Sequence, residues 1–185
     1  MPESTRVPSF PATPSGPAQG TLKTSRRGRP RYAELHCITN FSFLEGASHP
    51  DELVERAGGL GYEALAITDR NSLAGVVRAD TAAKAVGLKL IIGAEITLRN
   101  ALSVVLLAPD RPAYGRLARI ITNGRRRAPK GGCELYFEDL VDLSTGLLAC
   151  VLPSRPTEDS AFDKKYLDSC QAYGELFGDR SFLLA

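Results

Sequence analysis

The sequence is poor in the residues and motifs on which several common enzyme mechanisms depend. Its 185 residues include only two histidines, His36 and His49. It contains no G-x-S-x-G turn, no phosphate-binding P-loop and no G-x-G-x-x-G motif. Cys37 directly follows His36 on a predicted strand, so the two side chains should point to opposite faces. Ser/His/Asp catalysis and a Cys/His dyad are therefore poorly supported.

Cysteine is also scarce, and no two of the four cysteines have CxxC spacing. This pattern argues against a zinc knuckle and a disulfide framework, and a reducing cytoplasm is the natural compartment. No apolar run approaches the roughly 20 residues of a membrane span. The first residues lack the basic and then apolar plan of a secretory signal. We therefore expect a cytoplasmic protein that does not associate with membranes.

The basic character of the chain is concentrated at its start. Residues 1–31 hold six of the twelve prolines and six Lys/Arg against one acid, whereas the remainder holds 17 Lys/Arg against 20 acids. Because residues 1–31 lack hydrophobic periodicity, we predict a disordered basic tail. The run at 26–31 is either a phosphate contact or a solvated linker. The mildly acidic remainder, residues 32–185, gives no nucleic-acid footprint by charge alone.

From Tyr32 onward, short apolar runs alternate with helical patterns. We predict strands at 32–37, 64–68 and 88–92. A helix should begin near Pro50, and a second should run from a cap at Asn71 or Ser72 to Val86. A glycine, a strand and an acid recur 26 residues apart, at 61–69 and 87–95. This repetition predicts a parallel α/β sheet or barrel.

The second half continues with a different pattern. We predict a hairpin from 96–98 and 103–107, helices at 114–123, 137–143 and 162–177, and strands at 147–152 and 181–184. Arg125–Arg127 and Lys130 lie in a predicted loop, which is either solvated or in contact with phosphate. The chain is too short for a complete (β/α)₈ barrel of about 250 residues. Because it stops on an apolar run, we expect it to be a fragment of a longer protein.

Three polar side chains follow or end predicted neighbouring strands: His36, Asp69 and Glu95. Functional groups gather at the carboxyl ends of parallel strands, and this set could bind a divalent metal. Each residue has another interpretation. His36 could be a hydrogen-bonded interior histidine, and Asp69 could cap the turn ahead of Asn71. Glu95 follows a buried run and needs a partner, which could be Arg70 as easily as a metal.

The order of these segments resembles the PHP domain (polymerase and histidinol phosphatase) of bacterial C-family DNA polymerases. Three stretches carry most of the resemblance, at 35–48, 64–75 and 91–95. Their sequences are LHCITNFSFLEGAS, ALAITDRNSLAG and IIGAE. The residues around Ile38 and Arg70 are most similar to those of the error-prone branch of the family. The resemblance implies a distorted (β/α)₇ barrel, of which this chain supplies the first part, truncated at its carboxyl end.

The departures from the family pattern affect its metal ligands. Ligand chemistry is kept at His36, Glu45, Asp69 and Glu95. The positions of three further family histidines are held by Ile38, Arg70 and Ser103. Isoleucine cannot coordinate a metal, and arginine introduces a permanent cation. The resemblance therefore implies a vestigial metal site, in which Arg70 should pair with one or more of Glu45, Asp69 and Glu95.

The resemblance also carries expectations about function. The parent family synthesises DNA across lesions from dNTPs, with Mg²⁺ in a palm domain that these residues do not contain. Translesion accessory proteins are possible partners of such an enzyme. This segment should therefore be mainly structural, with no cofactor or catalytic residue of its own. Two alternatives stay open: a metal-dependent phosphoesterase of the histidinol-phosphatase kind, and a non-enzymatic truncated remnant.

Overall fold

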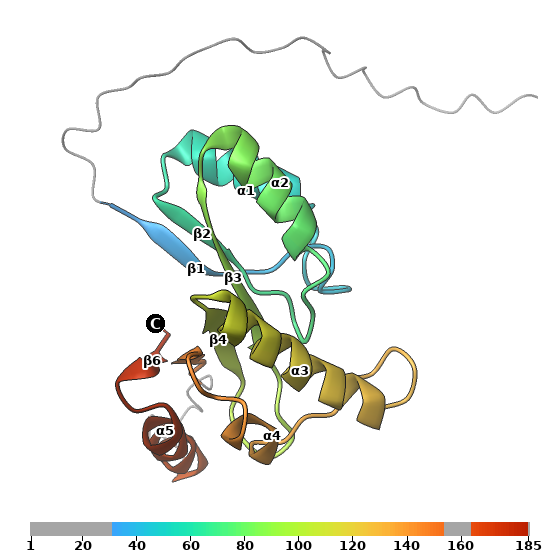
Figure 1. Cartoon of the computed structure of the whole chain (residues 1–185), viewed down its shortest axis with the longest axis vertical. Helices are drawn as coiled ribbons and strands as arrows, with labels where there is room; N and C mark the ends of the chain where they lie inside the picture. Colours follow the sequence, from blue (N-terminus) through green and yellow to red (C-terminus); the bar gives the residue numbers. More distant parts are fainter. Residues whose placement is uncertain (1–30, 154–163, 185) are drawn as a thin grey trace, which may run out of the picture. The chain divides into compact units, whose positions relative to one another are not determined.

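A computed structural model describes residues 31–153 and 164–184 of the chain. Within these residues the strands form one sheet in the order β1-β2-β3-β4-β5-β6. The predicted tail, apart from Arg31, lies outside the described residues. So does the start of the helix predicted at 162–177. The fold class is confirmed: a mixed α/β sheet curls into a half-barrel (Figure 1).

The first half of the sheet is parallel, as predicted. Strands β1 (Ala33–Cys37), β2 (Ala64–Ile67) and β3 (Lys89–Ile96) pair in parallel. Helices α1 (Pro50–Leu60) and α2 (Val76–Val86) connect them and pack against each other (Figure 1). Each helix ends at a glycine in the left-handed region, Gly61 with φ 78° and Gly87 with φ 70°. Glycine takes this conformation without steric cost, which explains both stops.

The second half of the sheet begins with a hairpin, as predicted, but its first arm is the end of β3 and not a strand at 96–98. Strand β4 (Val104–Ala108) pairs antiparallel with β3 and with β5 (Leu148–Val151), and β6 (Ser181–Leu183) pairs parallel with β5. Helices α3 (Arg111–Arg127), α4 (Glu138–Val141) and α5 (Lys164–Phe177) accompany these strands, and a 3₁₀ turn, η1 (Gly178–Arg180), precedes β6.

Several predicted boundaries were wrong, including the start of α3, which lies at Arg111 and not at Tyr114. Helix α2 begins at Val76 after Gly75, not at a cap on Asn71 or Ser72, because Asn71 adopts φ 47° and belongs to the preceding loop. Strand β3 runs through Glu95 to Ile96, since β4 continues the hydrogen-bonded ladder to that point. Arg125–Arg127 form the last turn of α3 and not a loop, because Gly124 is packed inside the helix against Leu135.

The two faces of the sheet bury different apolar clusters. Leu65 and Ile67 of β2 face α1 and α2, whereas Ala66 faces the concave side together with Val105 and Cys150. An apolar hollow of about 1100 Å³ is lined by residues of β1, β3, β4, β5 and β6 and also by residues of α2 and α3. The alternation of a strand therefore supplies one core under the helices and a second inside the half-barrel.

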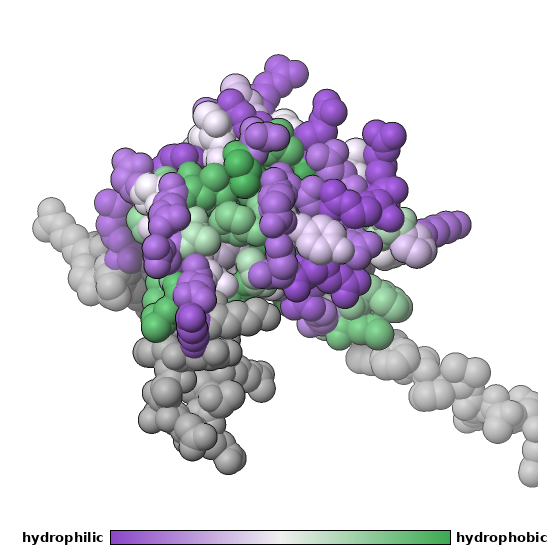
Figure 2. All heavy atoms as spheres, turned by 90° about the horizontal axis from the view of Figure 1, so that it is seen from below, coloured by the Kyte–Doolittle hydropathy of each residue, from purple (hydrophilic) through white to green (hydrophobic). Residues whose placement is uncertain are grey.

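The face seen in Figure 2 is mostly hydrophilic, with hydrophobic side chains gathered in smaller areas. Figure 2 shows one such area surrounded by charged and polar side chains. No helix in residues 31–153 or 164–184 combines the length and the apolar character that a membrane crossing requires.

Candidate functional site

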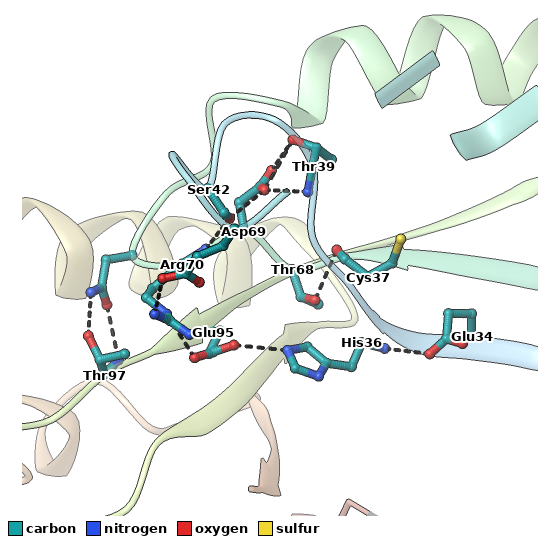
Figure 3. Close-up of polar contacts among 12 residues, drawn as sticks. Glu34, His36, Cys37, Thr39, Ser42, Thr68, Asp69, Arg70, Glu95 and Thr97 are labelled. Carbon is teal, nitrogen blue, oxygen red and sulfur yellow. Dashed lines mark hydrogen bonds and ion pairs between the residues drawn. The ribbon is translucent and has the colours of Figure 1, made fainter. Parts of the chain in front are cut away.

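The site is built where the parallel strands end. His36 of β1 and Glu95 of β3 come from strands on either side of β2, and His36 Nε2 lies 2.9 Å from Oε2 of Glu95 (Figure 3). Arg70 follows β2, and its Nε donates to Oε1 of the same carboxylate at 3.0 Å. The two carboxylate oxygens of Glu95 are thus hydrogen-bonded to two different side chains. His36 is therefore a partly buried histidine that is hydrogen-bonded, as its alternative interpretation expected.

Arg70 also reaches the loop that follows β1. Its terminal nitrogen Nη1 donates to Oε1 of Glu45. One guanidinium therefore joins two carboxylates that lie 50 positions apart in the sequence. The sequence predicted that Arg70 pairs with one or more of Glu45, Asp69 and Glu95. The structure confirms the prediction through Glu45 and Glu95. Arginine suits this role because its planar group presents several donors in fixed directions.

Glu95 is the buried member of this network, with only 5% of its surface exposed. Burial raises the pKa of its carboxyl group. The hydrogen bond with His36 and the positive charge of Arg70 act in the opposite direction and outweigh burial, so the pKa lies below its ordinary value. Glu95 is consequently a charged group inside the protein, and it depends on its two partners for that charge.

Asp69 does not join the network, although it directly precedes Arg70. Its side chain is 1% exposed and turns toward the loop after β1 (Figure 3). It accepts hydrogen bonds from the Thr39 amide at 2.7 Å, from the Thr39 hydroxyl at 2.9 and 3.1 Å, and from the Ser42 hydroxyl at 2.8 Å. Of the three acids that could pair with Arg70, Asp69 is thus the one that does not. The alternative in which Asp69 caps the turn ahead of Asn71 is not found either, since the Asn71 amide donates to the Glu95 carbonyl at 2.8 Å.

Thr39 and Ser42 are the residues that sequence reasoning missed. Ser42 donates to Asp69 and accepts from the backbone amide of Arg70 at 2.9 Å. It thus fixes the backbone from which Arg70 projects. The available signal was a pair of hydroxyl residues in the loop after the first strand. That pattern is typical of side chains that cap backbone groups, but it does not reveal the acceptor, which is 27 positions away.

The donor set does not fit a metal ion. The guanidinium of Arg70 lies between Glu45 and Glu95, where it supplies positive charge but no lone pair. Asp69 is committed to Thr39 and Ser42. Across the part of the chain that the structure describes, no three His, Cys, Asp or Glu side chains are grouped as metal ligands. We derive no metal-dependent step from this arrangement.

Ile38 and Ser103, which replace two of the family's histidine ligands, lie at the same edge of the sheet as Glu95. Ile38 follows the end of β1, and Ser103 directly precedes β4, whose first residue pairs with Ile96. Ser103 engages through its backbone, since its carbonyl accepts from the Leu152 amide at 3.0 Å. Neither side chain adds a metal ligand to the set that the carboxylates form.

The three arginines in the last turn of α3 have mainly internal contacts. Arg125 donates to the Asn71 carbonyl at 3.0 Å and so ties the end of α3 to the loop that carries Arg70. Arg127 forms two hydrogen bonds of 2.7 Å with Asp139 and stacks over Tyr136. Two of the three consecutive arginines therefore stabilise the fold, which weakens the interpretation of this segment as a phosphate-binding loop.

Comparison with known proteins places this site in a family. The model of the PHP domain matches residues 34–185. The chain belongs to the PHP domain family. The resemblance seen in the motifs at 35–48, 64–75 and 91–95 is thereby confirmed. In this PHP domain, a guanidinium occupies the space between acids at the strand ends.

Relatives of this PHP domain carry the name error-prone DNA polymerase. The protein from Rhodopirellula baltica is 51% identical over 162 residues, a match that covers 84% of this chain and 14% of that protein. The one from Aromatoleum aromaticum is 52% identical over 155 residues and covers 82% and 14%. The one from Dechloromonas aromatica is 57% identical over 115 residues and covers 62% and 11%. The matches thus span 11–14% of the length of these relatives.

Solved structures support the fold of the PHP domain. A protein of Bifidobacterium adolescentis assigned as a metal-dependent phosphoesterase matches with a TM-score of 0.56 at 17% identity, over 76% of this chain and 73% of that one. An amidohydrolase of Chromobacterium violaceum matches with a TM-score of 0.53 at 17% identity, over 81% and 75%. At this identity, the likeness concerns the fold alone.

Proposed function

We propose that this PHP domain is the amino-terminal module of an error-prone DNA polymerase, with a structural role in that enzyme. The names of the relatives support the parent activity, since identities of 51% and 52% extend over most of this chain. In that setting the substrates are a DNA template and dNTPs, and Mg²⁺ acts in the palm domain and not in this segment. Translesion accessory proteins and a cytoplasmic location belong to the same proposal.

The observation that carries the structural role is the position of Arg70. Its guanidinium supplies the positive charge that Glu45 and Glu95 need, and it does so without a dissociable ion. A buried carboxylate is costly unless it is paired, so the pairing holds the strand ends and the β1–α1 loop together. We interpret the site as a vestigial metal centre that a covalently attached cation now stabilises.

The phosphoesterase alternative has less support. Metal-assisted hydrolysis needs ligands that hold the ion and leave a position open for water. Ile38 and Ser103 contribute none, and Arg70 opposes a metal by charge. The fold likeness to a metal-dependent phosphoesterase at 17% identity does not restore the missing donors.

The test is a graft of residues 34–184 into the R. baltica polymerase in place of its matched segment. If the proposal holds, the graft extends a primed DNA template, and deletion of the segment sharply shortens the thermal half-life of that activity. Purified graft and isolated chain should also hold less than one zinc or manganese ion at this site. A graft that is inactive beside an active R. baltica enzyme would contradict the proposal.

A further inference from the structure

The loop between β1 and α1 presents two large apolar side chains to solvent. Phe43 is 83% exposed and Leu44 is 88% exposed. We call these two residues the apolar tip. Among the exposed large hydrophobic residues of the described chain, they have the largest exposed fractions. They are also adjacent in sequence and stand next to Glu45, the partner of Arg70.

The base of this loop is held by several hydrogen bonds. Besides the contacts of Asp69, the Ser42 amide donates to the Thr39 carbonyl at 2.9 Å, and the amides of Glu45 and Gly46 both donate to the Ser42 carbonyl at 3.0 Å. The Asn40 amide donates to the Ser48 carbonyl at 2.9 Å and closes the loop. The apolar tip is therefore displayed on a fixed support, and ordering it on a partner costs little entropy.

The backbone of the apolar tip is also strained. Leu44 has φ 65°, a conformation that a leucine rarely adopts. Residues are kept in such conformations where the surrounding structure imposes them, and these places are often binding sites. Here the hydrogen bonds on either side impose it and direct the leucine outward. The internal packing of the domain gains nothing from this side chain.

We infer that the apolar tip is a docking element that inserts into an apolar recess on the polymerase portion of the same polypeptide. This inference rests on the proposed function. The matched segment is 14% of the R. baltica relative, so the rest of that protein is about six times as long as this segment and would be a covalently linked partner. Its neighbour Glu45 already has Arg70 as a partner, so covering the tip does not leave this carboxylate unpaired.

The experiment uses the graft described above and the isolated 185-residue chain. The test variant combines Phe43→Ser with Leu44→Asn, because asparagine tolerates positive φ. The matched control is Leu167→Ser on α5, which also removes an exposed apolar side chain, 55% exposed and far from the loop in sequence. Hydrogen exchange of amides 40–46, thermal half-life of primer extension and the melting temperature of the chain are measured.

The inference predicts at least tenfold slower exchange of amides 40–46 in the graft than in the isolated chain. It predicts that the double variant shortens the half-life of the graft at least fivefold while Leu167→Ser does not. The melting temperature of the isolated chain should be unchanged or slightly raised in the double variant.

Three results would overturn the inference. Equal exchange and equal half-lives in an active graft would reject the docking role and leave the proposed function standing. An inactive graft would reject both. If the wild-type chain dimerises and the double variant is monomeric, the partner that covers the apolar tip is a second copy of the chain.

Discussion

Arg70 and Glu95 face each other across the ends of β2 and β3, with Nε of the guanidinium 3.0 Å from Oε1 of the carboxylate. Their backbones form an isolated parallel bridge, so the contact extends the pairing of the two strands beyond β2. The same guanidinium also contacts Glu45 in the loop between β1 and α1. This single side chain therefore connects three segments of the chain, and the first prediction concerns its removal.

Replacing Arg70 with alanine should lower the free energy of unfolding by about 1–2 kcal/mol. The buried Glu95 would keep His36 as its partner, and the 41% exposure of the Arg70 side chain reduces the loss through solvent screening. Denaturant unfolding of wild type and variant measures the change. Arg78→Ala is the control, since its pair with Asp51 is more exposed and should matter less. An equal effect of the two substitutions would contradict a special role for Arg70.

Replacing Asp69 with alanine should be more damaging, at about 3 kcal/mol or more. The substitution leaves the Thr39 amide and the Ser42 hydroxyl without their acceptor in a buried position. Asp69→Asn should cost less because one carboxamide oxygen can still accept. Circular dichroism during thermal unfolding ranks the variants. If Asp69→Ala melts like wild type, the loop does not depend on this carboxylate.

The stability of the domain should decrease in acid through Glu95. Its pKa in the folded protein lies below the ordinary value of 4.5, so the folded state favours the charged form. That stabilisation is fully present above pH 4.5 and is lost as the pH falls through the lower folded-state pKa. Unfolding free energies measured from pH 7 to pH 3 should therefore converge between wild type and Glu95→Gln at the acid end. Parallel curves would show that Glu95 does not contribute.

Replacing Arg70 with histidine should allow weak zinc or manganese binding. The new imidazole would stand near His36, Glu45 and Glu95, which are ligand types that both metals accept. Ile38 and Ser103 still leave the ligand shell incomplete, so we expect low affinity. Isothermal titration with zinc compares wild type, Arg70→His and Arg70→His with Glu95→Gln. Tight binding by the wild type would overturn the vestigial interpretation.

Two glycines should respond oppositely to alanine. A Cβ at Gly46 would overlap the Thr39 carbonyl, so Gly46→Ala should destabilise the loop by about 2 kcal/mol. A Cβ at Gly59 in α1 meets no atom within 4 Å, and Gly59→Ala should stabilise by about 0.5–1 kcal/mol through helix propensity. Thermal melts of the two variants provide the measurement, and a harmless Gly46→Ala would show that the loop adjusts freely.

The sequence by itself determined the alternation of helices and strands, because apolar periodicity and glycine stops are local signals. Gly61 and Gly87 end their helices where the pattern predicted. Boundaries that depend on partners were missed. Glu95 lies inside β3 because β4 extends the ladder, and Arg125 lies in a helix because Leu135 packs against Gly124.

Within the site, the sequence identified one set through ligand positions and a substituted cation: His36, Glu45, Asp69, Arg70 and Glu95. Only the tertiary structure separated Asp69 from its neighbour Arg70. Both side chains leave adjacent positions at the end of β2, but one meets the hydroxyl groups of the β1–α1 loop and the other meets carboxylates. Residue type and spacing specify which charges are available. The packing of a loop against a strand end decides which of them meet, because hydrogen bonds act over about 3 Å and not along the sequence.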